Sequence, residues 1–159
     1  RKPQDSMCRR EIMLMTFSRQ PRKQVTRPSW DTIWMSFAQT ISARSIDPRY
    51  KVGAIVVSNN NTQVLSVGYN GDHAGGPNQV ESSDPGHSGC LHAEINALIK
   101  LDYNNPNKKR MYITLSPCRS CAKAIVNASI DEVIYRDEYR DTSGLDLLRD
   151  AGVSVRRFV

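Results

Sequence analysis

The sequence contains no long apolar run and no secretion signal. None of its segments approaches the roughly 18 consecutive apolar residues of a membrane-spanning helix, and none shows the charged, apolar and small-residue blocks of a signal peptide. It also contains no internal repeat. We therefore expect a cytoplasmic protein with no membrane partner, and 159 residues are enough for one domain with a buried core.

Beyond its first 27 residues the chain has no surplus of either charge. The formal charge is +6, and residues 1–27 alone hold eight Lys or Arg against two Asp or Glu, so the rest of the chain is neutral. A large polynucleotide-binding face needs basic residues to neutralise phosphates, so we expect no polynucleotide partner. We divide the chain into a basic N-terminal arm at 1–27 and a domain at 28–159. We expect the arm to be flexible, although contact with nucleic acid or an acidic partner stays open.

Cysteine is also scarce, and its pattern does not indicate a disulfide scaffold. The four cysteines stand at positions 8, 90, 118 and 121. In a cytosolic chain, a close pair such as Cys118 and Cys121 more often binds a metal or carries redox chemistry.

The periodicity of the apolar residues predicts alternating helices and strands. "SWDTIWMSFAQTIS" has helical spacing after Ser29, a suitable N-cap, and predicts that Trp30 and Trp34 lie in the core. Residues 70–89 form a long loop, which is typical of a functional segment. Together the elements predict an α/β fold with three layers (α/β/α), in which a mixed five-stranded sheet has helices on both faces. The further expected helices are 91–101 (with Leu91, Ile95, Leu98 and Ile99 on the apolar face), 118–129 and 143–152, and the expected strands are 52–57, 64–69, 111–115, 132–136 and 153–158.

Two short motifs supply residues that could hold a metal. "HAE" contains His92 and Glu94, and "SPCRSC" contains Cys118 and Cys121, each where a helix is expected to begin. Zinc binds imidazole and thiolate, and a catalytic site keeps a fourth position for water. The positive end of a helix dipole favours thiolates at this position. A thioredoxin-like C-x-x-C, an ordinary core histidine and a structural zinc site with Cys90 as fourth ligand stay open on this evidence.

From Trp30 to Phe158 the chain resembles the deoxycytidylate (dCMP) deaminase family, within the zinc-dependent cytidine/deoxycytidylate deaminase superfamily. The resemblance rests on "SARSIDPRYKVGA", "GYNG", "CLHAEINAL", "SPCRSCAKAI", "DEYR" and "LLRDAGV". H-x-E with P-C-x-x-C is the signature of the zinc deaminases. The resemblance implies a cytidine-deaminase-like fold and the hydrolysis of dCMP to dUMP and ammonia, which supplies dUMP for thymidylate synthesis.

The resemblance also assigns roles to individual residues. It implies one catalytic Zn²⁺ per subunit, with Glu94 as the proton shuttle and Asn70 on the sugar. The metal ligands would be His92, Cys118 and Cys121, and the substrate-binding residues Ser45, Arg49, Asn70, Ala93, Tyr139 and Arg140. Cys90 would then be a packing residue and not a ligand. A second zinc is not expected, because Asp47 and Gln79 stand where some relatives have cysteine.

Many members of the family are hexamers that dCTP activates and dTTP inhibits. The resemblance therefore implies a homohexamer with a regulatory nucleotide site, where dCTP could bring Mg²⁺. The candidate regulatory residues are Gly71, Gly75, Asn78 and Glu81. His73 and Gln79 depart from the family pattern in this loop. Two alternatives remain: a deaminase of tRNA or single-stranded DNA, which the shared zinc motifs and the basic arm favour, and a non-catalytic zinc protein that binds nucleotides.

Overall fold

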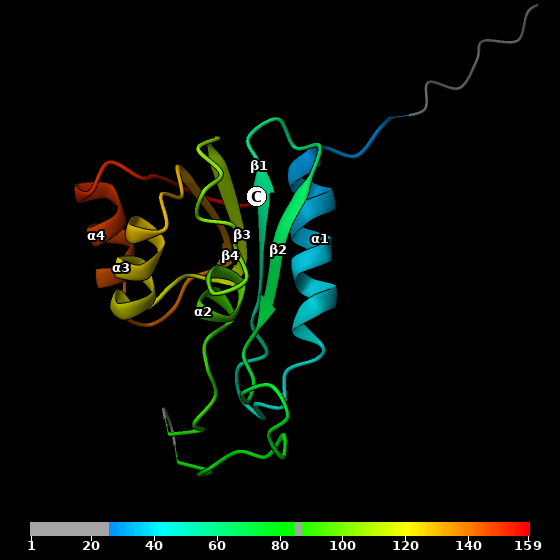
Figure 1. Cartoon of the computed structure of the whole chain (residues 1–159), viewed down its shortest axis with the longest axis vertical. Helices are drawn as coiled ribbons and strands as arrows, with labels where there is room; N and C mark the ends of the chain where they lie inside the picture. The colour runs from blue at the N-terminus through cyan, green and yellow to red at the C-terminus, as the bar shows by residue number, and fades with distance from the viewer. Residues whose placement is uncertain (1–25, 85–86) are drawn as a thin grey trace, which may run out of the picture.

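The computed structural model describes residues 26–84 and 87–159 as a three-layer α/β/α domain (Figure 1). Most of the predicted arm at 1–27 lies outside these residues. Among the described residues, no helix has the length and apolarity to cross a membrane. The elements in chain order are α1 (Trp30–Ser42), β1 (Gly53–Ser58), β2 (Val64–Tyr69), α2 (Ala93–Leu98), β3 (Lys109–Leu115), α3 (Arg119–Asn127), β4 (Glu132–Asp137), α4 (Ser143–Asp150) and β5 (Ser154–Arg157).

The predicted fold class is confirmed, because the five strands form one mixed sheet between two helical layers. The strand order is β2-β1-β3-β4-β5. β1 is antiparallel to β2 and β3, whereas β3, β4 and β5 are parallel. Figure 1 shows α1 on one face of the sheet and α2, α3 and α4 on the other. The long segment between β2 and α2 extends beyond the end of the sheet at the bottom of this view.

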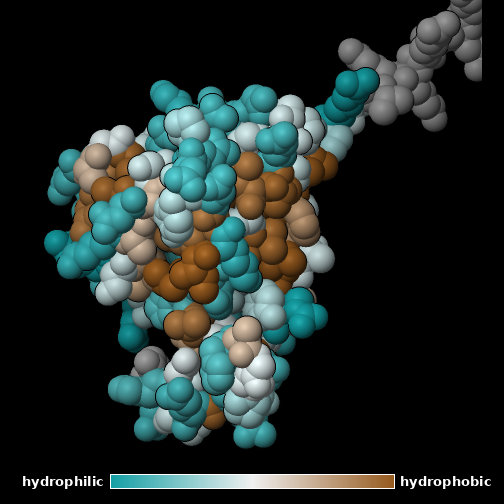
Figure 2. Space-filling view, viewed as in Figure 1, coloured by the Kyte–Doolittle hydropathy of each residue, from teal (hydrophilic) through white to brown (hydrophobic). Residues whose placement is uncertain are grey.

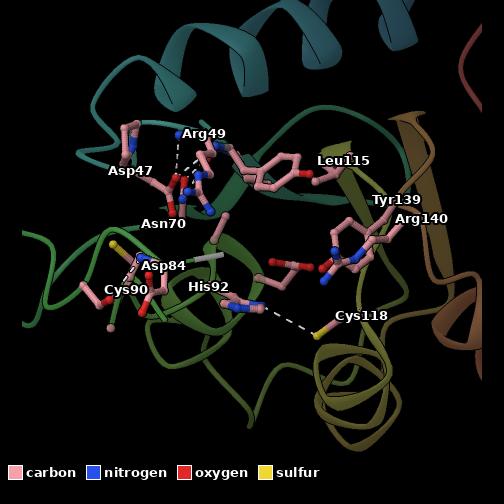
Figure 3. A pocket seen from close by; sticks show the side chains of 18 of the residues that line it. Asp47, Arg49, Asn70, Asp84, Cys90, His92, Leu115, Cys118, Tyr139 and Arg140 are labelled. Carbon is pink, nitrogen blue, oxygen red and sulfur yellow. Dashed lines mark hydrogen bonds between the residues drawn. The ribbon is translucent and has the colours of Figure 1, made fainter. Parts of the chain in front are cut away.

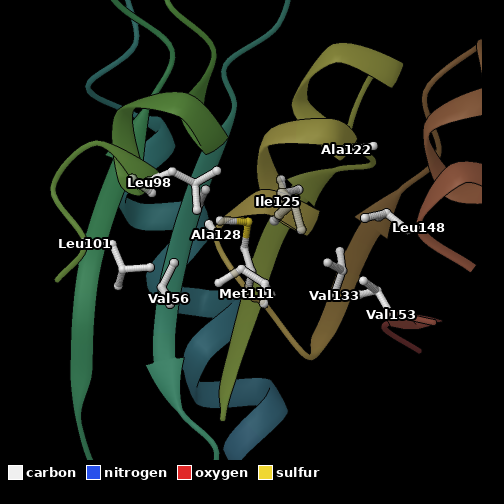
Figure 4. Packing of buried hydrophobic residues seen from close by; sticks show 14 of the residues in the cluster. Val56, Leu98, Leu101, Met111, Ala122, Ile125, Ala128, Val133, Leu148 and Val153 are labelled. Carbon is white, nitrogen blue, oxygen red and sulfur yellow. The ribbon is translucent and has the colours of Figure 1, made fainter. Parts of the chain in front are cut away.

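The three central strands, β1, β3 and β4, are largely buried on both faces, which explains their nearly continuous apolar sequences. In β1, Ile55 and Val57 pack against α1, whereas Ala54 and Val56 belong to the larger cluster under the other three helices. Figure 4 shows that this larger cluster joins β1, β3 and β4 to the helices above them. The core therefore fixes both helical layers to the strands, and with them the polar segments that follow these strands.

The start of α1 is held by a polar network that also reaches the far edge of the sheet. The Ser29 hydroxyl accepts the Thr32 backbone N–H at 3.1 Å, so the predicted N-cap is present. Both Asp31 oxygens accept hydrogen bonds from the Arg156 guanidinium of β5, at 2.6 and 2.9 Å. The buried Tyr112 hydroxyl of β3 donates to the same carboxylate at 2.7 Å. This network ties α1 to two strands.

Several predicted core positions are wrong, because they lie on the outer side of α1 or beyond the ends of α2. Trp30 is 52% exposed and stacks on the partly buried Trp34, with ring centroids 5.5 Å apart. In α2, Leu91 and Ile99 are exposed at 41% and 62%, since the regular helix covers only Ala93–Leu98 and both residues lie beyond its ends. Figure 2 shows apolar side chains on the surface along α1, where the exposed large residues are Trp30, Ile33 and Phe37.

Candidate active site

Three side chains from the starts of two helices meet at one point, near the carboxyl end of β3. His92 is the N-cap of α2, and Cys118 is the N-cap of α3, with Cys121 in the first turn of that helix. The His92 Nδ1 lies 3.6 Å from the Cys118 Sγ and 3.3 Å from the Cys121 Sγ. In the described part of the chain, this is the one group of three such residues whose ligand atoms lie together, all within 4.8 Å of one another.

These distances fit a shared zinc ion. Zn–N and Zn–S bonds of ~2.05 and ~2.3 Å at a tetrahedral angle place the two ligand atoms ~3.5 Å apart, close to both observed separations. One nitrogen and two sulfurs also leave a fourth tetrahedral position, as in catalytic zinc sites. Cys90 is not part of the group. The cofactor prediction is therefore confirmed at the level of the site: His92, Cys118 and Cys121 form a group suited to catalytic Zn²⁺.

The electrostatics of the site favour a thiolate even before a metal binds. Hydrogen bonds from the Cys121 thiol and from His92 lower the pKa of Cys118 to about 3. Conversely, the hydrogen bond to the Cys118 thiolate, together with burial, raises the pKa of Cys121. The hydrogen bond to Cys118 also raises the pKa of His92. The two sulfurs thus share one proton, and a divalent cation would displace it because metal ligands must be deprotonated.

Glu94 lies beside the metal ligands in the first turn of α2 and is only 4% exposed. Its burial raises the pKa of the carboxyl group, with the nearby charge of Cys118 acting in the same direction. A raised pKa makes this carboxylate a stronger proton acceptor than an ordinary one, and general acid–base catalysis requires a group that accepts a proton and later releases it. Glu94 is not one of the grouped ligands, so it remains available for proton transfer.

The first turn of α2 is positioned by a very close contact with β2. A Cβ atom at Gly68 would overlap the Ala93 carbonyl oxygen and the Ala97 backbone nitrogen, and would lie 2.9 Å from the Asn96 carbonyl carbon. Position 68 therefore requires glycine, since no side chain fits between strand and helix. The Asn96 amide adds a hydrogen bond to the Tyr69 carbonyl at 2.9 Å. These contacts hold His92 and Glu94 against the sheet.

The metal group opens into a pocket of about 490 Å³, within the usual range for small-molecule sites. Figure 3 shows His92 and Cys118 on one side of it, Arg49 and Asn70 on another, and Tyr139 with Arg140 together on a third. Of the six substrate-binding candidates, five line the pocket: Arg49, Asn70, Ala93, Tyr139 and Arg140. The pocket thus combines a metal group, a buried carboxyl group and two guanidinium groups.

Comparison with known proteins places this site in a family. Residues 28–137 match the family described as "Cytidine and deoxycytidylate deaminase zinc-binding region". The chain belongs to this deaminase family. It is 34% identical over 143 residues to the human deoxycytidylate deaminase, covering 82% of this chain and 80% of that protein. The Saccharomyces cerevisiae deoxycytidylate deaminase is 33% identical over 83% of this chain, but the match covers only 46% of its own length.

Solved structures of deaminases have the same fold. The dCMP deaminase from cyanophage S-TIM5, crystallised in complex with dCMP and dUMP, is 36% identical and has a TM-score of 0.71. The match covers 84% of this chain and 99% of the phage chain. A deaminase/reductase from Thermotoga maritima has a TM-score of 0.59 at 20% identity, which shows the fold alone. The predicted family resemblance is thereby confirmed.

The deaminase pocket is bordered by an ordered turn that supports two candidate residues. The Ser45 hydroxyl accepts the Asp47 backbone N–H at 3.1 Å, and Ser45 is buried beneath the turn and does not line the pocket. Asp47 Oδ1 accepts the backbone N–H groups of Arg49 and Tyr50, at 2.8 and 2.9 Å. Burial acts to raise the pKa of Asp47, but these two bonds, together with a hydrogen bond from Ser88 and the charge of Arg49, lower it. The turn presents Arg49 at the pocket.

The Asn70 side chain is already engaged with the same segment of backbone. Its Oδ1 accepts the Val52 N–H at 2.7 Å, and its Nδ2 donates to the Tyr50 carbonyl at 2.6 Å. Both bonds agree on the orientation of the amide. One amide hydrogen is left for a ligand, so Asn70 can serve as a structural link and a donor at once.

Sequence reasoning missed part of the pocket wall. Asp47, Ser88 and residues 82–84 line the pocket, and the Arg49 guanidinium donates to the Ser83 carbonyl at 2.7 Å. "SID" followed by proline is a typical Asx-turn sequence, and it could have indicated the role of Asp47. No local pattern indicates that residues 82–84 return to Arg49, because this contact spans 34 positions.

The four candidate regulatory residues lie outside the pocket lining. Gly71 forms an isolated bridge with Leu91. Gly75 and Asn78 have positive φ angles of 81° and 54°, and the Glu81 backbone N–H donates to Ser88 at 3.0 Å. They belong to the segment between β2 and α2, and their binding role stays a prediction.

Proposed function

We propose that the chain catalyses the hydrolytic deamination of dCMP to dUMP and ammonia. The observation that carries the proposal is the group of three zinc ligands with an unused buried carboxyl group beside it, in a pocket that also contains two arginines. Membership of the deaminase family supports the reaction. The relatives named deoxycytidylate deaminases and the phage enzyme crystallised with dCMP and dUMP support the substrate.

His92, Cys118 and Cys121 would hold the zinc, which supplies the Lewis acidity that activates a water molecule for attack on C4 of cytosine. Glu94 accepts the proton that this water releases and delivers it to N3 of the ring. The same carboxylate then takes the proton of the new C4 hydroxyl group and passes it to the amino group, which leaves as ammonia while the C4 carbonyl forms. Its burial keeps bulk water from competing for these transfers.

The rest of the pocket selects a nucleotide. Arg49 and Arg140 are exposed guanidinium groups at the pocket wall, and they can bind the 5′-phosphate through paired N–H groups. Asn70 offers its free amide hydrogen to the sugar, and Tyr139 closes the wall beside Arg140. A polynucleotide substrate finds less support, since residues 28–159 carry no surplus of positive charge to bind many phosphates.

We also propose that the assembly and control follow the family. The chain forms a homohexamer in the cytoplasm, with dCTP as activator, accompanied by Mg²⁺, and dTTP as inhibitor. The loop that contains Gly71, Gly75, Asn78 and Glu81 contacts these effectors. Gel filtration with light scattering measures the assembly, and dCMP turnover with and without each effector measures the control.

Ammonia release from a panel of cytosine nucleosides, nucleotides and oligonucleotides tests the function directly. We expect turnover of dCMP, and a Glu94→Gln variant should lose 10²-fold or more in kcat while it keeps its zinc. Asp150→Asn removes an exposed carboxylate at the end of α4 and serves as the control with full activity. Normal turnover by zinc-loaded Glu94→Gln would contradict the assigned role, and turnover of oligonucleotides alone would indicate a polynucleotide deaminase.

A further inference from the structure

The segment that carries Tyr139 and Arg140 has no regular secondary structure of its own. It follows β4, which ends at Asp137, and precedes α4, which begins at Ser143. The Tyr139 ring meets the Tyr50 ring edge-on, with centroids 6.1 Å apart and an interplanar angle of 79°. The Arg140 guanidinium lies 5.7 Å from the centroid of the Tyr139 ring. The side chains of Tyr50, Tyr139 and Arg140 form one wall of the pocket. Because Tyr139 contacts both of the others, its position determines where this wall lies.

Ser116 holds this segment through two hydrogen bonds, one made by its hydroxyl oxygen and one by its backbone N–H. Its hydroxyl oxygen accepts the Tyr139 backbone N–H at 2.8 Å. Its own backbone N–H donates to the Asp137 carbonyl at 2.8 Å. Ser116 directly follows β3 and is 3% exposed, so water does not compete strongly for these bonds. It therefore fastens the segment after β4 to the strand end that leads to Cys118.

The Ser116 hydroxyl also retains an unused donor at the pocket. Among residues 26–84 and 87–159, its hydrogen meets no acceptor, although its oxygen has a partner. Ser116 lines the pocket, and buried polar groups are normally satisfied by protein, water or ligand. A ligand in the pocket is thus the natural acceptor for this hydrogen.

We propose that Ser116 is a positioning residue of the deaminase: its hydrogen bond to Tyr139 holds the pocket wall of Tyr139 and Arg140 in place beside the metal ligands and thereby sets the affinity for the nucleotide. The inference rests on the proposed function and extends it to a residue outside the metal ligands, the proton shuttle and the phosphate-binding arginines. It assigns the serine of "SPC" to substrate affinity, whereas the cysteines of the same motif serve the metal.

Kinetics of three serine variants test the proposal. Ser116→Ala should raise the KM for dCMP roughly 3- to 10-fold, the equivalent of one lost hydrogen bond, with a smaller change in kcat and unchanged zinc content. Ser116→Thr keeps the hydroxyl and should restore most of the affinity. Ser66→Ala is the matched control, because Ser66 is 8% exposed, has no partner for its hydroxyl among the described residues and lies outside the pocket lining.

Hydrogen exchange of the backbone in residues 137–142, measured by mass spectrometry, tests without any substrate whether Ser116 holds this segment in place. We expect faster exchange there in Ser116→Ala and not in Ser66→Ala. Unchanged exchange, a KM within 2-fold of the wild-type value, or a loss of kcat that follows a loss of zinc would each overturn the proposal. Absence of dCMP turnover by the wild-type chain would instead refute the proposed function, and the exchange measurement would still decide whether Ser116 holds the segment.

Discussion

Replacement of Gly68 by alanine should impair the metal site without changing any residue in it. The added methyl group would overlap two backbone atoms of α2 and lie 2.9 Å from a third, the Asn96 carbonyl carbon. Carbon atoms pack best at about 3.5–4.0 Å, so α2 must retreat from β2 by roughly 1 Å. Since Cys118 and Cys121 belong to a different helix, the retreat separates His92 and Glu94 from them.

A shift of this size should cost about 100-fold in kcat/KM and weaken zinc binding, together with about 1–3 kcal/mol of stability from overpacking. The measurements are zinc affinity in competition with a chromophoric chelator, kcat/KM for dCMP, and urea-induced unfolding. Zinc affinity and kcat/KM both within 3-fold of wild type would show that the reasoning about α2 is wrong.

Gly53→Ala provides the matched control on the other face of the sheet. There the new methyl group would overlap the Ala38 carbonyl oxygen and lie 2.8 Å from the Ser42 nitrogen, so it displaces α1. We expect a comparable loss of stability with nearly normal zinc affinity. An equal loss of zinc affinity in both variants would indicate general destabilisation and would contradict a specific effect of Gly68 on the site.

Three further predictions concern stability and thiol chemistry. The Arg156 hydrogen bonds hold the pKa of Asp31 below its usual value. The stability that they contribute is therefore present above the unfolded pKa of about 3.9 and is lost as the pH falls through the folded pKa. Between about pH 5 and pH 2, the Tm of the wild type should fall more steeply than that of Asp31→Asn. Tyr112→Phe removes the 2.7 Å bond to Asp31 and should cost about 1–2 kcal/mol in urea unfolding, whereas a loss below 0.3 kcal/mol would mean that this bond adds nothing to stability. Removal of zinc should accelerate alkylation of Cys118 at least 10-fold and leave that of Cys90 unchanged, as followed by peptide mass spectrometry; zinc protection of Cys90 would identify it as a ligand.

The sequence predicted the elements whose signals are local. The strand 52–57 reads as a continuous apolar run because both faces of β1 are covered, and Ser29 caps α1 as its position suggests. The zinc group was equally accessible, since each ligand belongs to a short motif at a helix start. Such signals depend on a few neighbouring residues, and tertiary packing does not change them.

Other features depend on contacts that no local pattern encodes. Helical spacing placed Trp30 in the core, but the outer side of α1 carries apolar residues too, so spacing alone could not tell the two sides apart. Ser45 was predicted to bind the substrate; in the folded turn its hydroxyl accepts the Asp47 backbone N–H, and Asp47 lines the pocket whereas Ser45 does not. The link from Ser116 to Tyr139 spans 23 positions and joins two strand ends that become neighbours only in the parallel sheet.

The arrangement of the three ligands also has a consequence for the folding chain. His92 is separated from Cys118 and Cys121 by 26 and 29 positions, and the whole of β3 lies between them. An ion held by all three is therefore a cross-link that closes a long loop and excludes many open conformations of the unfolded polymer. We expect the supply of zinc in the cell to determine how long each molecule survives proteolysis, in addition to how fast it catalyses its reaction.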